Sequence, residues 1–392
     1  MAEIKITASV TSSKLVNLYN IYINQSQEEN VKLTIPIKID KYRFGLLADF
    51  LKFIITLNNK TQIAVLKING KADDLDSLYD QEYAYPIISL LWNSTKFVDK
   101  DGQDIKYILR DKQNIFFTKM NSLLKIKGNK YILINTDHLP ESKGSIKLLE
   151  SVNGFNVNEN QVVNGIAKII NNYVLTLNKN NKNEIRGIVD DVSSVVYELL
   201  KNTYEWGKTR SDLVELSSSI RGLYIRFHNN NNNKAIEEYK NTPLEEFLKH
   251  PLVLNNCINE SGQMYYLEIM VFDSGVGFID RFTPRDCYGD LEIIKKCLIK
   301  NQTSSKSILK TKKGLGLDRI LNILNGKGFI RIDTDKYSVC RDLIKDNYKP
   351  IDVNNLSELV LDDWNKTNFS YFQLVKPSGT FISIMYPFKS MQ

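Results

Sequence analysis

Three short groups of residues in the second half of the chain have types and spacings suited to chemistry. The first consists of Glu198 and Asn202, with Glu205 following shortly after. Residues four apart share one face of a helix, so Glu198 and Asn202 are expected to point the same way, with Glu205 about one turn further on. A carboxylate and an amide oxygen on one face suit Mg²⁺ and a positioned water molecule. The ordinary alternative is the polar stripe of an amphipathic surface helix.

The second group is Asp273, Gly275 and Gly277, directly after a run that is typical of a strand. A carboxylate at a strand end can accept a hydrogen bond from an exocyclic amine. The glycines let the backbone approach a flat base and turn sharply. Because Asp and Gly also dominate ordinary turns, a plain β-turn is the alternative interpretation.

The third group is the run Lys312, Lys313, Gly314, Leu315, Gly316 and Leu317. It opens a predicted helix, where glycines leave backbone N–H groups facing a phosphate and the helix dipole favours an anion. A flexible loop before an ordinary helix is the alternative. The segment 295–313 contains seven lysines and no Asp or Glu, which equals the net charge of +7 of the whole chain. The positive charge beside this helix start favours phosphate as the partner of the segment.

The elements that must position these groups follow from hydrophobic periodicity. Helices are predicted at about 161–177, 184–206 and 315–324, and strands at about 223–228, 265–272, 329–332, 369–375 and 380–386. The first group lies on the second of these helices, which is expected to end at Gly207. We interpret 229–233 as a polar loop and 338–368 as an insertion before the two final strands.

The first 150 residues are predicted to form a mixed α/β unit. Strands are expected at 31–37 and 62–68, and helices at 44–55 and 83–92, with a boundary near 138–144. This half contains no motif that indicates chemistry. A sensor, a docking unit and a dimerisation unit all remain open for it.

Composition narrows the class of protein. A chain of 392 residues that is 42% hydrophobic and 25% charged is typical of a globular protein with more than one domain. No stretch reaches the length of a membrane span, and the amino terminus does not resemble a secretory signal. The four cysteines form no CxxC pair, which argues against zinc and a disulfide framework and favours the cytoplasm. The net charge alone does not choose between nucleic acid, membrane and phosphate as a partner.

The order of the three groups resembles the GHKL ATPase superfamily, which includes gyrase-type ATPases, MutL, the ninety-kilodalton heat-shock chaperone, histidine kinases and anti-sigma serine kinases. The resemblance covers about 155–388, and Thr380 falls where the family's closing strand begins. It implies an α/β fold for this part, specifically an α+β two-layer sandwich of the Bergerat type, with a lid at about 278–313. Together with the pattern of the first half, this predicts two domains, a smaller mixed α/β domain at 1–150 and the ATPase-like domain at 151–392.

The resemblance also implies roles for single residues. Asn202 would hold Mg²⁺, Asp273 would bind the adenine amino group, and Thr380 would lie beneath the base. The implied ATP contacts are Asn202, Glu205, Asp273, Gly275, Gly277, Lys312, Lys313, Gly314, Leu315, Gly316, Leu317 and Thr380. The family's fuller glycine motif is GxGLGL, and this sequence has Lys312 in place of its first glycine.

Glu198 distinguishes between branches of that superfamily. Gyrase-like members resemble this chain in using Glu as the base that activates water, whereas histidine kinases more often carry Asn there. None of His138, His228 and His250 lies in a predicted helical hairpin, so histidine autokinase activity is not expected.

We therefore predict a Mg²⁺-dependent ATP-binding and ATP-hydrolysing conformational switch. The alternatives are a serine/threonine kinase of the anti-sigma kind and a non-catalytic nucleotide sensor in a bacterial stress or phage-defence system. The expected partner, besides ATP, is another protein or a second copy of the chain, bound through the N-terminal domain. DNA is not favoured, because no recognition helix is identifiable.

Overall fold

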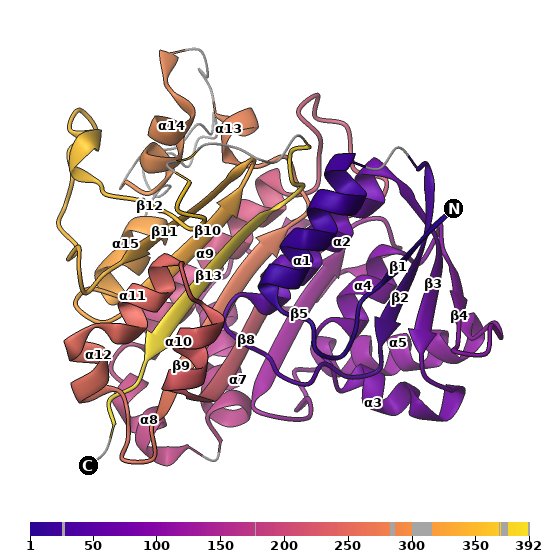
Figure 1. Cartoon of the computed structure of the whole chain (residues 1–392), viewed down its shortest axis with the longest axis horizontal. Coiled ribbons are helices and arrows are strands. Elements are labelled where there is room, and N and C mark those ends of the chain that lie inside the picture. Colours follow the sequence, from indigo (N-terminus) through magenta and orange to yellow (C-terminus); the bar gives the residue numbers. More distant parts are fainter. Residues whose placement is uncertain are drawn as a thin grey trace.

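Two β-sheets organise the chain, as the computed structural model in Figure 1 shows. The structure describes residues 1–25, 28–176, 178–282, 287–299, 316–367, 369 and 375–390. A four-stranded sheet belongs to the first third of the sequence, and a seven-stranded sheet is built mainly from the remainder. The fold is therefore of the mixed α/β class, as the sequence predicts.

The smaller sheet is entirely parallel. Its strands, in spatial order, are β1 (Ala2–Lys5), β2 (Asn30–Pro36), β3 (Gln62–Asn69) and β4 (Lys96–Val98). Parallel neighbours need crossover connections, which here contain helices. These helices are α1 (Ser12–Tyr19), α2 (Leu46–Lys60), α3 (Leu75–Tyr79) and α4 (Ala84–Leu90), and α5 (Lys106–Asn121) follows β4.

The larger sheet is antiparallel throughout, in the order β12-β11-β10-β13-β9-β8-β5. Its strands are β5 (Lys130–Thr136), β8 (Ile220–Asn231), β9 (Gln263–Asp273), β10 (Phe329–Thr334), β11 (Tyr337–Asp342), β12 (Asp362–Asp363) and β13 (Thr380–Pro387). A separate short hairpin joins β6 (Glu150–Ser151) to β7 (Gly154–Phe155). The central strands β9 and β13 are buried along almost their whole length.

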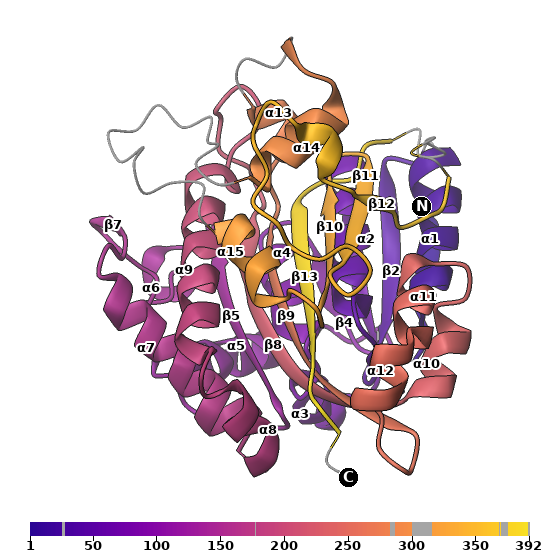
Figure 2. The same ribbon diagram turned by 90° about the vertical axis from the view of Figure 1, so that its left-hand side faces the viewer.

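Helices cover both faces of this sheet, as Figure 2 shows. On one face lie α7 (Glu159–Ile169), α8 (Lys179–Ile185), α9 (Val189–Trp206) and α15 (Gly316–Ile323). On the other face lie α2, α10 (Asn232–Glu238), α11 (Pro243–Lys249) and α12 (Pro251–Asn256). The short helices α6 (Glu141–Gly144), α13 (Phe278–Arg281) and α14 (Asp290–Cys297) lie in connections. Because α2 lies between the two sheets, nearly all of its residues up to Leu57 are buried.

Most predicted elements are confirmed. The predicted strands at 31–37, 62–68, 223–228, 265–272, 329–332 and 380–386 correspond to β2, β3, β8, β9, β10 and β13. The predicted helices at 44–55, 83–92 and 315–324 correspond to α2, α4 and α15. The predicted helix at 184–206 is interrupted, because α8 ends at Ile185 and α9 begins at Val189. The predicted helix at 161–177 continues from α7 into a π-helical turn, Ile170–Val174.

The prediction of a polar loop at 229–233 is wrong. Strand β8 continues to Asn231, and α10 begins at the next residue. The amide of Asn230 is buried and donates to the Tyr266 hydroxyl at 2.8 Å, while the Asn231 side chain accepts from the Lys234 N–H group at 3.1 Å. The asparagines are tolerated in ordered structure because the fold supplies hydrogen-bond partners that composition cannot reveal.

The interpretation of 338–368 as an insertion stays a prediction, and the segment contains strands of the larger sheet. β11 lies there and pairs with β10, and β12 in turn pairs with β11. The predicted strand at 369–375 falls mostly outside the described residues. The domain boundary near 150 stays a prediction, although β5, which precedes it, hydrogen-bonds to β8 in the larger sheet.

Candidate functional site

Asp273 lies at the end of β9 with its carboxyl group buried. One carboxyl oxygen, Oδ1, accepts a hydrogen bond from the Gly275 N–H group at 2.8 Å, and the backbone N–H of Thr380 also donates to this carboxyl group. Burial raises the pKa of Asp273 to about 7, although these hydrogen bonds and the charges of Arg221 and Arg281 act against the rise. A further hydrogen-bond donor that reached this carboxyl group would stabilise its ionised form.

Two glycines let the end of α9 touch the loop that follows Asp273. A Cβ on Gly207 would lie 2.4 Å from the Asp273 Cβ, and a Cβ on Gly275 would lie 2.9 Å from the Gly207 Cα. Both distances are shorter than any normal carbon–carbon contact, so larger residues would force the two segments apart. The glycine at the end of the helix therefore serves packing as well as helix termination.

A third glycine brings the start of β13 against the same loop. Gly379 has a φ of 92°, and a Cβ there would lie 2.3 Å from the Asp273 carbonyl oxygen. Its N–H group donates to the Gly275 carbonyl oxygen at 2.8 Å. The next residue, Thr380, stands opposite Asp273 in the β9–β13 pairing. The loop after β9 is thus enclosed by the last turn of α9 on one side and the start of β13 on another.

The structure places Gly277 beside the turn between β10 and β11. Its φ is 95°, and a Cβ there would lie 2.4 Å from the Asp335 carboxylate. That carboxylate accepts from the Ile279 N–H group at 3.0 Å, and the Thr334 hydroxyl accepts from the Phe278 N–H group at 2.9 Å. Two side chains of the β10–β11 turn therefore cap the start of α13 and hold the end of the loop.

The three polar residues of α9 differ in exposure. Glu198 and Glu205 are half-buried and Asn202 is exposed. Burial raises the pKa of Glu198, with a smaller contribution from Glu205, while Lys201 acts in the opposite direction. A raised pKa brings a carboxylate closer to the range in which a general base works at neutral pH. Asn202 precedes Gly207 by about 8 Å along the helix axis.

Helix α15 lies beside α9 (Figure 2) and is joined to it by apolar and polar contacts. Leu317 is buried, and the Arg319 Nη2 atom donates to the Asp191 carboxylate at 2.8 Å. Gly316 is the first residue of α15. The other members of the third group, Lys312, Lys313, Gly314 and Leu315, lie outside the described residues, as does most of the lysine-rich part of the predicted lid.

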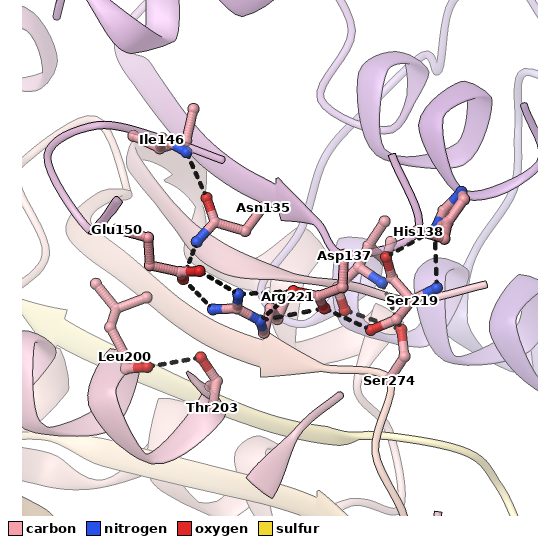
Figure 3. A network of polar contacts seen from close by, with 11 residues as sticks. Asn135, Asp137, His138, Ile146, Glu150, Leu200, Thr203, Ser219, Arg221 and Ser274 are labelled. Atoms are coloured by element: carbon pink, nitrogen blue, oxygen red, sulfur yellow. Dashed lines mark hydrogen bonds and ion pairs between the residues drawn. The ribbon is translucent and has the colours of Figure 1, made fainter. Parts of the chain in front are cut away.

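A buried network anchors the site to the neighbouring strands (Figure 3). The Arg221 guanidinium group on β8 donates to Asp137 at 2.7 Å and to Glu150 at 2.6 Å. The Ser274 hydroxyl accepts from the Ile220 N–H group at 3.0 Å and donates to the Ile220 carbonyl oxygen at 2.8 Å. The loop after β9 is therefore attached to β8 through Ser274.

Sequence reasoning missed four residues that shape this site. Gly207 was expected only to end a helix, and nothing in the sequence distinguishes Gly379 or Asp335 from ordinary turn residues. The fourth residue is Arg281, whose Nη2 atom donates to the Thr209 carbonyl oxygen at 2.7 Å and whose pKa burial lowers. All four act through contacts with segments far away in the chain, which local patterns do not contain.

The residues of the candidate site fit a metal ion that is held by few side chains and by substrate phosphates. Within the described ranges, no group of three or more His, Cys, Asp and Glu side chains could hold a metal ion. Mg²⁺ in nucleotide sites is often held by one or two side chains together with substrate phosphates, so the amide of Asn202 fits that pattern. Cys257, Cys287, Cys297 and Cys340 are free thiols in this structure.

Comparisons with protein-family models, with curated proteins and with solved structures give no match. In the part of the chain that the structure describes, no helix is long and apolar enough to cross a membrane.

Proposed function

We propose that the chain binds ATP with Mg²⁺ at the end of the seven-stranded sheet, hydrolyses it, and works as an ATP-driven conformational switch with a fold of the Bergerat type. One observation carries this proposal. Asp273 is a buried carboxyl group whose pKa is raised to about 7, held at a strand end by glycine contacts with α9 and β13. The exocyclic amine of adenine would donate to this carboxylate and offset part of the cost of its burial.

The surrounding residues have chemistry that suits the rest of the nucleotide. Gly275 packs closely against Gly207 and holds the loop beside Asp273, and Thr380 is buried next to Asp273. Asn202 would hold Mg²⁺ that is also bound to phosphate oxygens. Gly316 begins α15, and the N–H groups of a helix amino terminus favour phosphate. The lysines before it supply positive charge along the chain.

Glu198 is the residue that we assign as the general base. In-line attack on a γ-phosphate requires an oriented water molecule and a group that takes its proton. A half-buried carboxylate with a raised pKa accepts a proton more readily than an exposed one. Its side chain and that of Asn202 share one face of α9, so a base and a metal ligand would act from the same helix.

Contacts with the first half of the chain support the switch. The Thr56 hydroxyl on α2 accepts from the Ser378 N–H group at 3.0 Å, and the Tyr19 hydroxyl on α1 donates to the Val375 carbonyl oxygen at 2.7 Å. The segment 375–379 leads directly into Thr380. A ligand that moves this segment would therefore also move its contacts with α1 and α2.

The test combines nucleotide binding with phosphate release. We expect Asp273→Asn to weaken ADP binding by about 100-fold, because an amide placed opposite the adenine amine replaces an acceptor by a donor. Glu198→Ala should keep ADP binding and lose hydrolysis by about 100-fold to 10,000-fold. Asp111→Asn, an exposed substitution on α5, is the matched control.

Two results would contradict the assignment. Tight ADP binding by Asp273→Asn would show that Asp273 does not bind adenine. Hydrolysis at the wild-type rate by Glu198→Ala would show that Glu198 is not the general base. If labelled γ-phosphate is recovered on a serine or threonine of another protein and no free phosphate is released, the reaction is phosphotransfer and not hydrolysis.

A further inference from the structure

A second polar pocket lies away from the proposed nucleotide site, between the first part of the chain and β8. Its cavity volume is about 290 Å³. The walls come from the segment 38–42 after β2, from residues 81–82 before α4, from the first residue of β5 and from residues 226–230 of β8. Two connecting segments of the first part of the chain and two strands of the larger sheet therefore meet around one cavity.

The floor of the pocket holds two cations on one buried carboxylate. Glu82 is 1% exposed, and its Oε2 atom lies 3.3 Å from the Lys130 Nζ atom. Its other oxygen, Oε1, accepts from the Arg226 Nη1 atom. The Arg226 guanidinium group also lies 4.7 Å from the centre of the Tyr42 ring. A carboxylate and an aromatic ring thus orient Arg226 in advance, and Glu82, Lys130 and Arg226 together carry one net positive charge.

The rim adds further positive charge. Lys38 and Lys41 are exposed at the opening, together with Asp40. The lining therefore contains four cationic side chains and two carboxylates, a surplus of two positive charges. Burial lowers the pKa of Lys130, and burial together with Arg43 lowers the pKa of Lys41. Both ammonium groups would gain stability from a nearby anion.

We propose that this pocket binds a small dianion of the phosphate or phosphate-monoester class. Arg226, whose Nη1 atom contacts Glu82, would contribute positive charge from β8, and Lys130 and Lys41 would contribute point charges from two other segments of the lining. A dianion matches the surplus of two charges. The volume suits a phosphate group with a small organic body, since ligand cavities begin at about 300 Å³. This site is separate from the nucleotide site and does not depend on the ATPase proposal.

The experiment is a calorimetric titration of the full chain with inorganic phosphate and, separately, with glucose 6-phosphate. It is done at constant ionic strength and at a slightly alkaline pH, where phosphate is a dianion. We expect Lys41→Ala to weaken binding by about tenfold, because it removes one charge-assisted contact. Lys119→Ala, an exposed lysine on α5, should leave binding unchanged.

A second variant tests the contribution of Arg226 and Glu82 at the floor of the pocket. Arg226→Gln alone leaves the buried Glu82 with one partner fewer, so it is combined with Glu82→Gln to keep the charge of the floor unchanged. The double variant should fold, as judged by circular dichroism, and lose phosphate binding by about tenfold or more. Equal affinity for both ligands identifies free phosphate as the occupant, and tighter glucose 6-phosphate binding identifies a phosphorylated metabolite.

Three outcomes would overturn the proposal. One is no binding of either ligand to the wild-type chain. Another is wild-type affinity in both Lys41→Ala and the double variant. The third is loss of phosphate binding in Asp273→Asn, which would assign the phosphate to the nucleotide site instead. If Asp273→Asn fails to bind ADP but binds phosphate normally, the two sites are independent.

Discussion

The two faces of the seven-stranded sheet are covered by different kinds of contact. On the face that carries the proposed nucleotide site, α9 and α15 meet the sheet through apolar side chains. These include Val192, Val195, Ile269, Ile320 and Ile323. On the opposite face, α2 places Asp49 and Lys52 against Arg331 and Asp333 of β10. The Arg331 Nη2 atom lies 2.6 Å from Asp49 and 2.9 Å from Asp333, and the Lys52 Nζ atom lies 2.7 Å from Asp333.

The two kinds of contact differ in how strictly they hold a helix in position on the sheet. Apolar contact is non-directional, so a small shift of α15 along α9 costs little as long as the buried area is kept. A buried ion cluster tolerates no such shift, because each charge loses its partner and retains the cost of burial. Although burial acts to raise the pKa of Asp49, Arg331 and Lys52 hold it well below its usual range. We infer that the face with α9 and α15 is adjustable and that the face with α2 is rigid.

The largest expected effect comes from breaking the ion cluster. Asp49→Ala leaves Arg331 buried with one carboxylate partner fewer, so we expect the free energy of unfolding to fall by about 3 to 5 kcal/mol. Urea denaturation followed by circular dichroism measures this loss. The control is Asp76→Ala, which removes an ion pair with Lys112 from a side chain that is 81% exposed. A loss below about 1 kcal/mol for Asp49→Ala, the level of an exposed pair, would contradict a rigid face.

A smaller effect is expected where α9 touches the loop after β9. Gly207→Ala would place a Cβ 2.4 Å from the Asp273 Cβ, so the helix end and the loop must separate. We expect a loss of about 1 to 3 kcal/mol of unfolding free energy together with weaker ADP binding. Gly187→Ala has open space around the new Cβ and should change stability by less than about 1 kcal/mol. Equal behaviour of the two variants would show that the α9 contact is not tight.

The pH dependence of stability tests the Asp273 carboxyl group itself. Its pKa is raised from 3.8 to about 7 on folding, so its contribution to stability is complete below pH 3.8 and is lost as the pH rises through 7. Between about pH 6 and 8 the unfolding free energy of the ligand-free protein should fall by about 1 to 1.5 kcal/mol more than that of Asp273→Asn. ADP should bind more tightly at the higher pH, where the acceptor is ionised. Parallel pH profiles for the two proteins would be incompatible with a raised pKa.

The smallest effect is expected for the exposed ion pair between α15 and α9. Arg319→Ala removes the pair with Asp191, in which both side chains are partly exposed. We expect a loss of about 0.2 to 1 kcal/mol that shrinks further in high salt. Thermal melts at low and high salt measure both quantities. A loss larger than about 2 kcal/mol would show that this ion pair, and not apolar contact, positions α15.

Local sequence patterns predicted much of the candidate site. The helical spacing of Glu198 and Asn202 and the strand before Asp273 are local signals, and the structure shows the helix and the strand that they indicate. The extension of β8 to Asn231 was missed, because polar residues enter a strand only when distant partners such as Tyr266 satisfy them. The role of Gly207 was missed for the same reason, since its neighbour Asp273 belongs to another element.

The sequence by itself determined the order of the chemical groups and the type of element that carries each, because helix and strand periodicities depend on neighbours within a few positions. Only the tertiary structure decided that α2 covers the second face of the large sheet. Asp49 and Arg331 are 282 positions apart, and each alone would be taken for an exposed charge. Asp49 and Arg331 can both be buried because the fold places their opposite charges at hydrogen-bond distance, and that distance depends on the whole chain.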